Sequence, residues 1–302
     1  MGTGIVSVAL SLAHQEVLSR IWLVLAAAAW VVLAILVGLR LLWDRPGMRA
    51  EARTPAGLTI VAATAVLGSR LLTGGRRTDA LVLLVVAVTI WLGLSVVLLR
   101  HRRLPSTGSS FMLTVSIQSL AVLAAPISAT EAAPWLAWAA LVACAFGIAT
   151  YPLVLVRFDP RQLLVGRGDQ WVAGGALGIS ALATSQISLA AARVGTLRAM
   201  VPTLHTMSVL IWAGGIVWLA ALIAGEIASP RLGYDARRWS TIFPVGMYAA
   251  SSHEVARTAG LPPVDAVATV WTWVSVALWL LVAAAMVRRL ASGGSRIRTC
   301  VG

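Results

Sequence analysis

The histidines, cysteines and acidic residues of this chain do not form a pattern that supports catalysis. His253-Glu254 begins like the metal-binding helix of a zinc protease, but Arg257 stands where the second histidine ligand would be. Cys144 lies alone in an apolar stretch, and no serine has a histidine or lysine partner at comparable depth. Together with Cys300, Cys144 gives neither a disulfide framework nor metal spacing. We therefore expect no enzyme activity, no cofactor and no metal site.

Two sets of neutral polar side chains recur at the four-residue spacing of one helix face, inside otherwise apolar stretches. They are Ser110, Thr114 and Gln118 in one stretch, and Ser180, Thr184 and Ser188 in another. At membrane depth, polar side chains are tolerated where they face protein or water. Each trio therefore either holds neighbouring helices together or lines a water-filled path.

A third feature is the pair Phe243-Pro244, with Ser240 four residues before the proline and Gly246 two residues after it. Pro244 has no N–H to donate to the carbonyl of Ser240, so we expect a kinked helix with a free acceptor. Such an acceptor is acceptable inside a membrane only where protein or water satisfies it. Phe243, beside the expected kink, is then either a packed aromatic side chain or one that closes a path.

The composition shows that these residues are positioned by membrane helices. The chain has 302 residues, of which 59% are hydrophobic and 12% are charged, and its mean hydropathy is +0.87. Such values lie outside the range of soluble domains. Several tryptophans stand at the edges of apolar stretches, as in the aromatic belts of membrane proteins. They are Trp22, Trp43, Trp135, Trp171 and Trp239.

Nine apolar segments approach or exceed the roughly 20 residues with which a helix crosses a bilayer. They are Ile21–Trp43, Ala56–Leu72, Asp79–Leu99, Ser110–Ala125, Trp135–Val156, Trp171–Ala190, Thr203–Gly225, Trp239–Thr258 and Ala266–Val287. Met1–Ala13 precedes them and is too short to span. We interpret it as the second half of a helix that begins upstream, although a re-entrant or interfacial piece also fits. We therefore expect an all-α polytopic protein with ten helices in five hairpins, one transport domain at 1–290 and a short basic cytoplasmic tail at 291–302.

The basic residues support this topology. All 24 are arginines, and the formal net charge is +13. They are scattered between apolar segments, so they do not form the basic patch of a nucleic-acid-binding protein. With the C-terminus in the cytoplasm, 17 lie inside and 7 outside, in line with the positive-inside rule. The outer seven are Arg20, Arg70, Arg76, Arg77, Arg193, Arg198 and Arg257. The lysine-free composition suggests a GC-rich bacterial genome, and hence the bacterial inner membrane.

Polar content alternates along the ten segments. The odd-numbered segments, with the ninth counted over its first fourteen residues (Trp239–Ser252), hold 20 Ser, Thr and Gln residues, against 9 in the longer even-numbered ones. Glycine and proline also concentrate there, as Gly174, Gly175 and Gly178 in the seventh segment and Pro244 and Gly246 in the ninth. Helix adhesion alone does not explain this alternation. It favours an inner ring of odd helices around a neutral polar path, surrounded by the even helices.

The run Arg-Trp-Ser-Thr-Ile-Phe-Pro-Val-Gly-Met-Tyr at 238–248 resembles the ninth helix of the tellurite-resistance/dicarboxylate transporter family. That family includes sulfite efflux pumps and the slow anion channels of plant guard cells. Residues 1–7, 111–125 and 171–183 resemble its first, fifth and seventh helices. The resemblance implies a central pore lined by the odd helices, homotrimers, and a plug formed by Phe243.

The resemblance also implies that small inorganic or organic anions cross the lipid bilayer. No charged residue lies near the centre of a predicted span, so we expect a neutral pore that binds anions weakly and lets them leave. The expected pore-lining residues are Ser110, Thr114, Gln118, Ser180, Thr184, Ser188, Ser240 and Gly246, with Phe243 and Pro244 at the gate.

Alternatives remain at this point. A proton-coupled carrier of dicarboxylates, sulfite or tellurite needs a proton site, for which His205, His253 and Glu254 are candidates. A purely structural role would leave the polar stripes without a purpose. The outer residues Arg70, Arg76, Arg77, Arg193 and Arg198 either concentrate anions at the outer mouth or are ordinary surface arginines. The anion itself stays open among chloride, nitrate, sulfite, tellurite and dicarboxylates.

Overall fold

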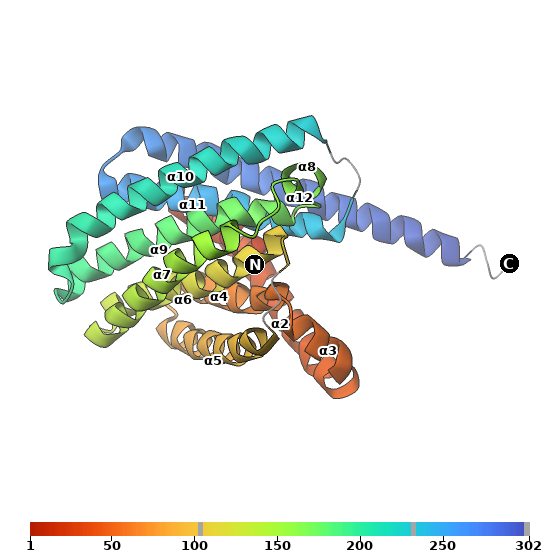
Figure 1. Ribbon diagram of the computed structural model, residues 1–302, viewed down its shortest axis with the longest axis horizontal. Coiled ribbons are helices and arrows are strands. Elements are labelled where there is room, and N and C mark those ends of the chain that lie inside the picture. Colours follow the sequence, from red (N-terminus) through yellow and green to blue (C-terminus); the bar gives the residue numbers. More distant parts are fainter. Residues whose placement is uncertain (102–104, 231–233, 299–302) are drawn as a thin grey trace.

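The computed structural model describes residues 1–101, 105–230 and 234–298, with the backbone alone for 292–298. Across this part of the chain all regular structure is helical, which confirms the predicted all-α polytopic fold (Figure 1). The main helices are α1 (Gly2–Leu12), α2 (Glu16–Trp43), α4 (Thr59–Thr73), α5 (Arg77–His101), α6 (Met112–Thr130), α7 (Pro134–Leu155), α9 (Val172–Val194), α10 (Val201–Ala228), α11 (Trp239–Ala259) and α12 (Pro262–Arg298). Short helices α3 (Arg45–Ala52) and α8 (Gln162–Val165) lie in connections. Cys300 and three arginines predicted on the inner side, Arg102, Arg103 and Arg231, lie outside the described residues.

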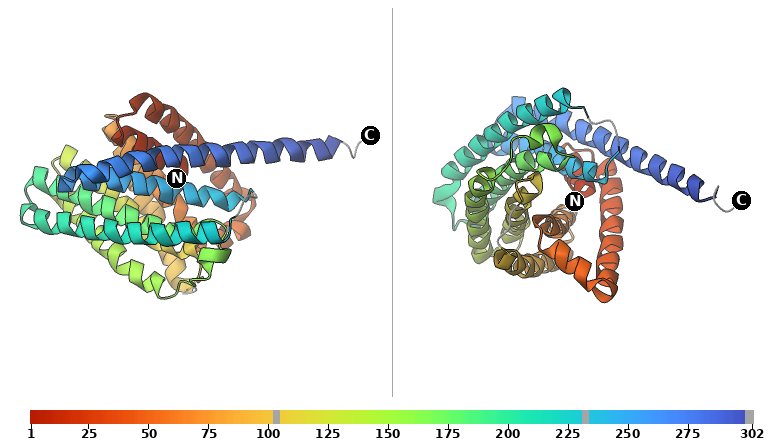
Figure 2. Two further views of the ribbon diagram at one scale, coloured as in Figure 1. Left: turned by 90° about the horizontal axis from the view of Figure 1, so that it is seen from above. Right: turned by 45° about the vertical axis from the view of Figure 1, so that its right-hand side comes forward.

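Each predicted segment corresponds to one of the ten main helices, and eight of these are long and apolar enough to cross a membrane. α1 and α11 fall outside that group. α1 has 11 residues, and the second half of α11 carries His253, Glu254 and Arg257. α12 continues beyond the predicted end of the tenth span, and its C-terminal part projects from the bundle (Figure 2).

Five helices form a closed inner ring. α1 packs against α4, α4 against α6, α6 against α9, α9 against α11, and α11 against α1. Each outer helix packs against the inner helix of its own hairpin and against a neighbouring inner helix: α2, α5, α7, α10 and α12 all follow this rule. The alternation of polar content along the sequence therefore corresponds to an inner and an outer layer.

Burial follows the same division. In their most apolar 18-residue windows, 89% of the residues around α6 and 83% of those around α9 are buried, against 11% to 28% in the outer helices. Every residue of α11 from Thr241 to Ala256 is buried. A helix that faces only protein needs no lipid-compatible surface, which explains why α11 has the weakest apolar signal and still lies in the inner layer.

Several hydroxyl groups of the inner helices form hydrogen bonds with outer helices. The indole N–H groups of three outer-layer tryptophans donate to inner-layer hydroxyls over 2.8 to 3.0 Å. The pairs are Trp30–Thr64, Trp212–Ser252 and Trp279–Thr3. The hydroxyl of Tyr248 on α11 likewise donates to the carbonyl of Gly215 on α10, over 3.0 Å. Part of the polar content of the inner ring therefore serves helix adhesion, where hydrogen bonds add to van der Waals packing.

Four of the inner helices begin with a 3₁₀ turn. The turns are η1 (Pro55–Leu58) before α4, η2 (Gly108–Phe111) before α6, η3 (Asp169–Trp171) before α9 and η5 (Ala236–Arg238) before α11. η1 touches η2, and η2 touches η3. A Cβ on Gly108 would lie 2.1 Å from the carbonyl oxygen of Asp169, and one on Gly168, whose φ is +120°, would lie 2.7 Å from that of Arg237. We call these four turns the collar, because they join the N-terminal ends of the inner helices.

Candidate functional site

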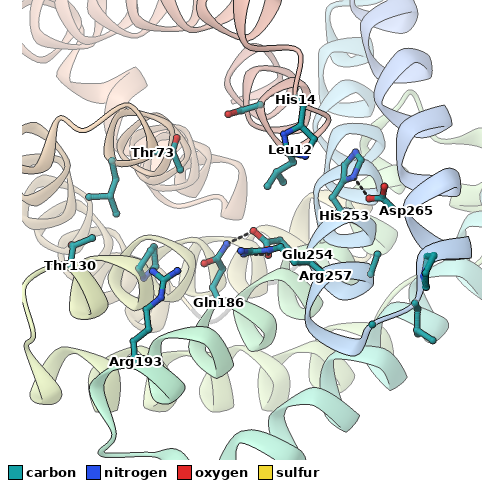
Figure 3. Close-up of a pocket in the computed structure, with 17 residues that line it drawn as sticks. Leu12, His14, Thr73, Thr130, Gln186, Arg193, His253, Glu254, Arg257 and Asp265 are labelled. Carbon is teal, nitrogen blue, oxygen red and sulfur yellow. Dashed lines mark hydrogen bonds and ion pairs between the residues drawn. The ribbon is translucent and has the colours of Figure 1, made fainter.

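The C-terminal ends of the five inner helices surround a cavity of about 680 Å³. Each helix contributes to its wall: Leu12 from α1, Thr73 from α4, Thr130 from α6, Gln186 from α9 and Glu254 from α11 (Figure 3). All five helices therefore run in one direction, and the cavity lies at one end of the ring axis. We call it the wide cavity.

A smaller cavity of about 90 Å³ shares part of this wall and again receives residues from all five inner helices. Its apolar lining includes Val8, Val122 and Leu182, while Arg70 and Glu254 bring opposite charges to it. We call it the narrow cavity. The sequence predicts a path without charged groups, with Arg70 and Glu254 near the ends of their spans. In the structure, both charged side chains are buried in the wall of the narrow cavity.

Glu254 is held by donors on both carboxylate oxygens. The amide Nε2 of Gln186 donates to Oε1 over 2.7 Å, and Nε and Nη2 of Arg257 donate to Oε2 over 3.0 and 2.5 Å. The Glu254 side chain is 2% exposed, whereas that of Arg257 is 54% exposed. The carboxylate is therefore fixed inside the wall, and its counter-charge stands toward open space.

Arg70, which lines the narrow cavity from α4, is likewise fixed by several hydrogen bonds. Its guanidinium donates to Glu16 over 2.7 Å, to the hydroxyl of Ser19 over 2.8 Å and to the hydroxyl of Thr73 over 3.1 Å. These contacts join α4 to the start of α2. The Arg70 side chain is 2% exposed and that of Glu16 is 45% exposed, so here the cation is the buried member of the pair.

This asymmetry gives a prediction for stability. Glu16→Gln leaves a buried guanidinium without a counter-charge, at a cost of roughly 3–5 kcal/mol in the free energy of unfolding. Arg70→Met leaves a half-exposed carboxylate that water can solvate, so we expect a smaller loss. Thermal unfolding in detergent should therefore give the lower Tm for Glu16→Gln. Asp79→Asn, in an exposed ion pair, serves as the control with little change, and equal or reversed Tm losses for Glu16→Gln and Arg70→Met would contradict this account.

Below the two cavities, the ring is filled with apolar side chains. On α11, Phe243, Met247 and Ala250 lie at helical spacing from Glu254, so they share the face that reaches the cavities. All three are fully buried. Phe243 lies about 16 Å below Glu254 along the helix axis, at 1.5 Å per residue. Its hydrophobic cluster includes one or more residues from each of the other inner helices, among them Ile5, Val66, Val115 and Ile179.

The residues beside Phe243 bring helix backbones close together. A Cβ on Gly175 of α9 would lie 2.9 to 3.0 Å from three atoms of Pro244, and a Cβ on Gly246 would lie 2.6 Å from Ile5 of α1. Pro244 and Gly246 therefore set the distance from α11 to its two ring neighbours. Both positions fix where the aromatic ring of Phe243 sits.

Comparison with known proteins decides the family. The sequence profile of the voltage-dependent anion channel family matches residues 1–287. The chain belongs to this family. It is also 32% identical over 128 residues to uncharacterized membrane proteins from two strains of Mycobacterium tuberculosis, CDC 1551 and H37Rv. That match covers 40% of this chain and spans 64% of the length of those relatives.

In this member of the voltage-dependent anion channel family, one residue of each polar trio contacts Cys144 of the outer helix α7. The amide of Gln118 donates to the carbonyl of Cys144 over 3.1 Å, and the hydroxyl of Thr184 lies 3.6 Å from Cys144 Sγ. Thr184 is two residues from the cavity residue Gln186, which places it on the opposite side of α9. No member of either trio lines the wide or the narrow cavity. Their pore-lining role stays a prediction.

The remaining predicted pore-lining hydroxyls either donate to a backbone carbonyl nearby in the sequence or have no hydrogen-bond partner in the described part of the chain. The hydroxyl of Ser110 donates to the carbonyl of Pro105, that of Ser180 to Ala176 and that of Ser240 to Arg237. Thr114 and Ser188 are buried, and their hydroxyls have no hydrogen-bond partner within the described part of the chain.

Gln186 is one of the polar side chains of the seventh segment, but it belongs to neither polar trio, so its spacing alone does not mark it as a site residue. Of the outer arginines, Arg70, Arg193 and Arg257 line a cavity. Of the proton-site candidates, His253 and Glu254 do so, whereas His205 does not. Gln186 lies one helical turn after Leu182, which also lines the narrow cavity. Its helical spacing predicts a cavity position only once the side of α9 that faces the cavity is known.

Proposed function

We propose that this protein passes small anions across the membrane through the centre of the five-helix ring, with Phe243 as the gate. The observation that carries this proposal is the pair of cavities that enter the ring from one end and stop above the fully buried face of Phe243. A hydrophobic constriction closes such a path by excluding water. Membership of the anion channel family supports anions as the ions that pass.

The chemistry of the wide cavity suits weak anion binding. Its wall offers the hydroxyls of Ser11, Thr73 and Thr130, the amide of Gln186 and the guanidinium of Arg193. The C-terminal helix ends bring partial negative charge to the same place, and the arginines offset it. Weak, distributed binding lets an ion both enter and leave.

We further propose the orientation and assembly that the sequence predicts. The C-terminus lies in the cytoplasm, the wide cavity opens to the outer side of a bacterial inner membrane, and three copies assemble as a homotrimer. The distribution of arginines supports the orientation. Chloride, nitrate, sulfite, tellurite and dicarboxylates are the candidate anions.

The test is a reversal potential. We expect the purified protein in planar bilayers, as wild type and as Phe243→Ala, to give currents that reverse near the Nernst potential of the anion in an asymmetric chloride salt. Replacing chloride on one side by nitrate, sulfite or a dicarboxylate then ranks the anions by the shift they produce. Reversal near the Nernst potential of the cation would contradict the proposal.

A proton-coupled anion carrier is the second candidate, because the buried carboxylate of Glu254 lines both cavities. Intramembrane carboxylates of this kind often relay protons in carriers. Proteoliposomes loaded with a pH dye distinguish the two. A carrier acidifies or alkalinises the lumen in proportion to anion uptake, whereas a channel does so only through the membrane potential.

A further inference from the structure

Glu254 stands at the junction of the two cavities. It lines both of them, together with Gln186, and its carboxylate shares the α11 face that leads down to Phe243. An anion that moves from the wide to the narrow cavity therefore passes this carboxylate. In a partly desolvated wall, a bare negative charge repels an anion more strongly than it does in water.

Arg257 is the group that compensates this charge. It donates twice to Glu254 Oε2, while Gln186 holds Oε1 (Figure 3). Gln186 is neutral, so it orients the carboxylate without cancelling its charge. The half-exposed Arg257 side chain can leave the pair without being desolvated elsewhere, and the charge at the junction then depends on where Arg257 lies.

The other charged and titratable groups near Glu254 come from every element packed around it. α11 itself supplies His253, whose Nδ1 lies 2.7 Å from Asp265 of α12. α9 supplies Arg193, α4 supplies Arg70 with its partner Glu16 of α2, and His14 follows α1. His205 of α10 lines neither cavity, and α6 contributes no charged group to either wall. Protonation of any of these histidines or carboxylates adds positive charge, so acid acts in one direction only.

We propose that Glu254 and Arg257 form a charge gate for anions at the outer junction of the path. Anions pass when the carboxylate is compensated by Arg257 or protonated, and they are held back when it is bare. Glu254 thereby makes anion passage depend on a single pair of residues, separate from the steric closure at Phe243. This inference rests on the proposed anion path.

The experiment is a double-mutant cycle in the Phe243→Ala background, where the steric gate is open. Arg257→Gln is expected to lower the anion current at neutral pH by roughly tenfold, the scale on which local charge alters ion access. Glu254→Gln gives at least the current of the background, and adding Arg257→Gln to it changes the current by less than about twofold, because the carboxylate charge that Arg257 compensates is then absent.

Arg76→Gln and Asp79→Asn are the matched controls. Arg76 and Asp79 form another arginine–carboxylate ion pair at a spacing of three residues, and neither residue lines a cavity. Neutralising them therefore measures the effect of surface charge alone. An unchanged current in Arg257→Gln would overturn the inference. So would an equal loss from Arg257→Gln with and without Glu254, since Arg257 would then act through its own charge. If the Phe243→Ala background carries no anion current, the proposed function fails as well; if it conducts without coupling, only the charge gate fails.

Discussion

Phe243→Ala is expected to raise the anion current of the reconstituted protein by roughly tenfold or more, since lowering a barrier by about 1.4 kcal/mol already gives a factor of ten. Phe243 is fully buried below the narrow cavity and belongs to the cluster that joins all five inner helices. Removing its ring leaves room for water in a layer that otherwise excludes it. Single-channel conductance in planar bilayers, or iodide influx into liposomes, measures the change.

Phe111→Ala is the control for this prediction. Phe111 is also fully buried, but its ring packs against Tyr151 and Phe158, with centroids 5.1 and 5.6 Å away. It therefore lies toward α7 and the loop that follows it. Both substitutions should cost roughly 3–5 kcal/mol of stability, and only Phe243→Ala should increase the current. Equal currents in Phe243→Ala and wild type would contradict the assignment of Phe243 as the gate.

Gly108→Ala is expected to prevent correct assembly of the ring. The added Cβ would lie 2.1 Å from the carbonyl oxygen of Asp169 and 2.4 Å from its carbonyl carbon. Backbone atoms cannot rotate away as a side chain can, so η2 must separate from η3. Overpacking typically costs about 1–3 kcal/mol, and a clash with rigid backbone belongs at or above the upper end. We expect a sharp loss of monodisperse protein in size-exclusion chromatography and a lower Tm.

Gly93→Ala provides the comparison, because a Cβ on Gly93 of α5 would meet no atom within 4 Å. In a helix interior this change should be neutral or stabilise the protein by about 0.5–1 kcal/mol. A Gly108→Ala protein as stable as Gly93→Ala would mean that the collar is not a rigid contact between the starts of α6 and α9.

Membrane residence and the two layers of helices could be predicted from sequence. A helix that faces lipid must be apolar on its exposed surface, whereas a helix that faces only other helices tolerates Ser, Thr, Gln, Gly and Pro. Hydropathy and polar content therefore report the surroundings of each helix directly. The polar content of Trp239–Thr258 likewise predicts that it lies inside the ring, although this is the least apolar of the nine spans.

The facing direction of individual side chains was decided only by the tertiary structure. A helix buried on all sides has no solvent face, so its polar periodicity does not distinguish the ring axis from the neighbour in the outer layer. Gln118 and Thr184 follow perfect helical spacing, yet both meet Cys144 of α7. Gln186 stands outside either trio and lines both cavities.

The charged groups at the cavities needed the assembled ring as well. Sequence placed Arg70 and Glu254 near the ends of separate spans, where charges are ordinarily solvated. Five helices that run in one direction bring those ends together around one axis, and each buried charge is then held by a partner from its own or a neighbouring helix. The sequence by itself determined which helices lie inside, because burial acts on whole segments. Only the tertiary structure determined which residues share a cavity, because that depends on how each helix is rotated about its own axis.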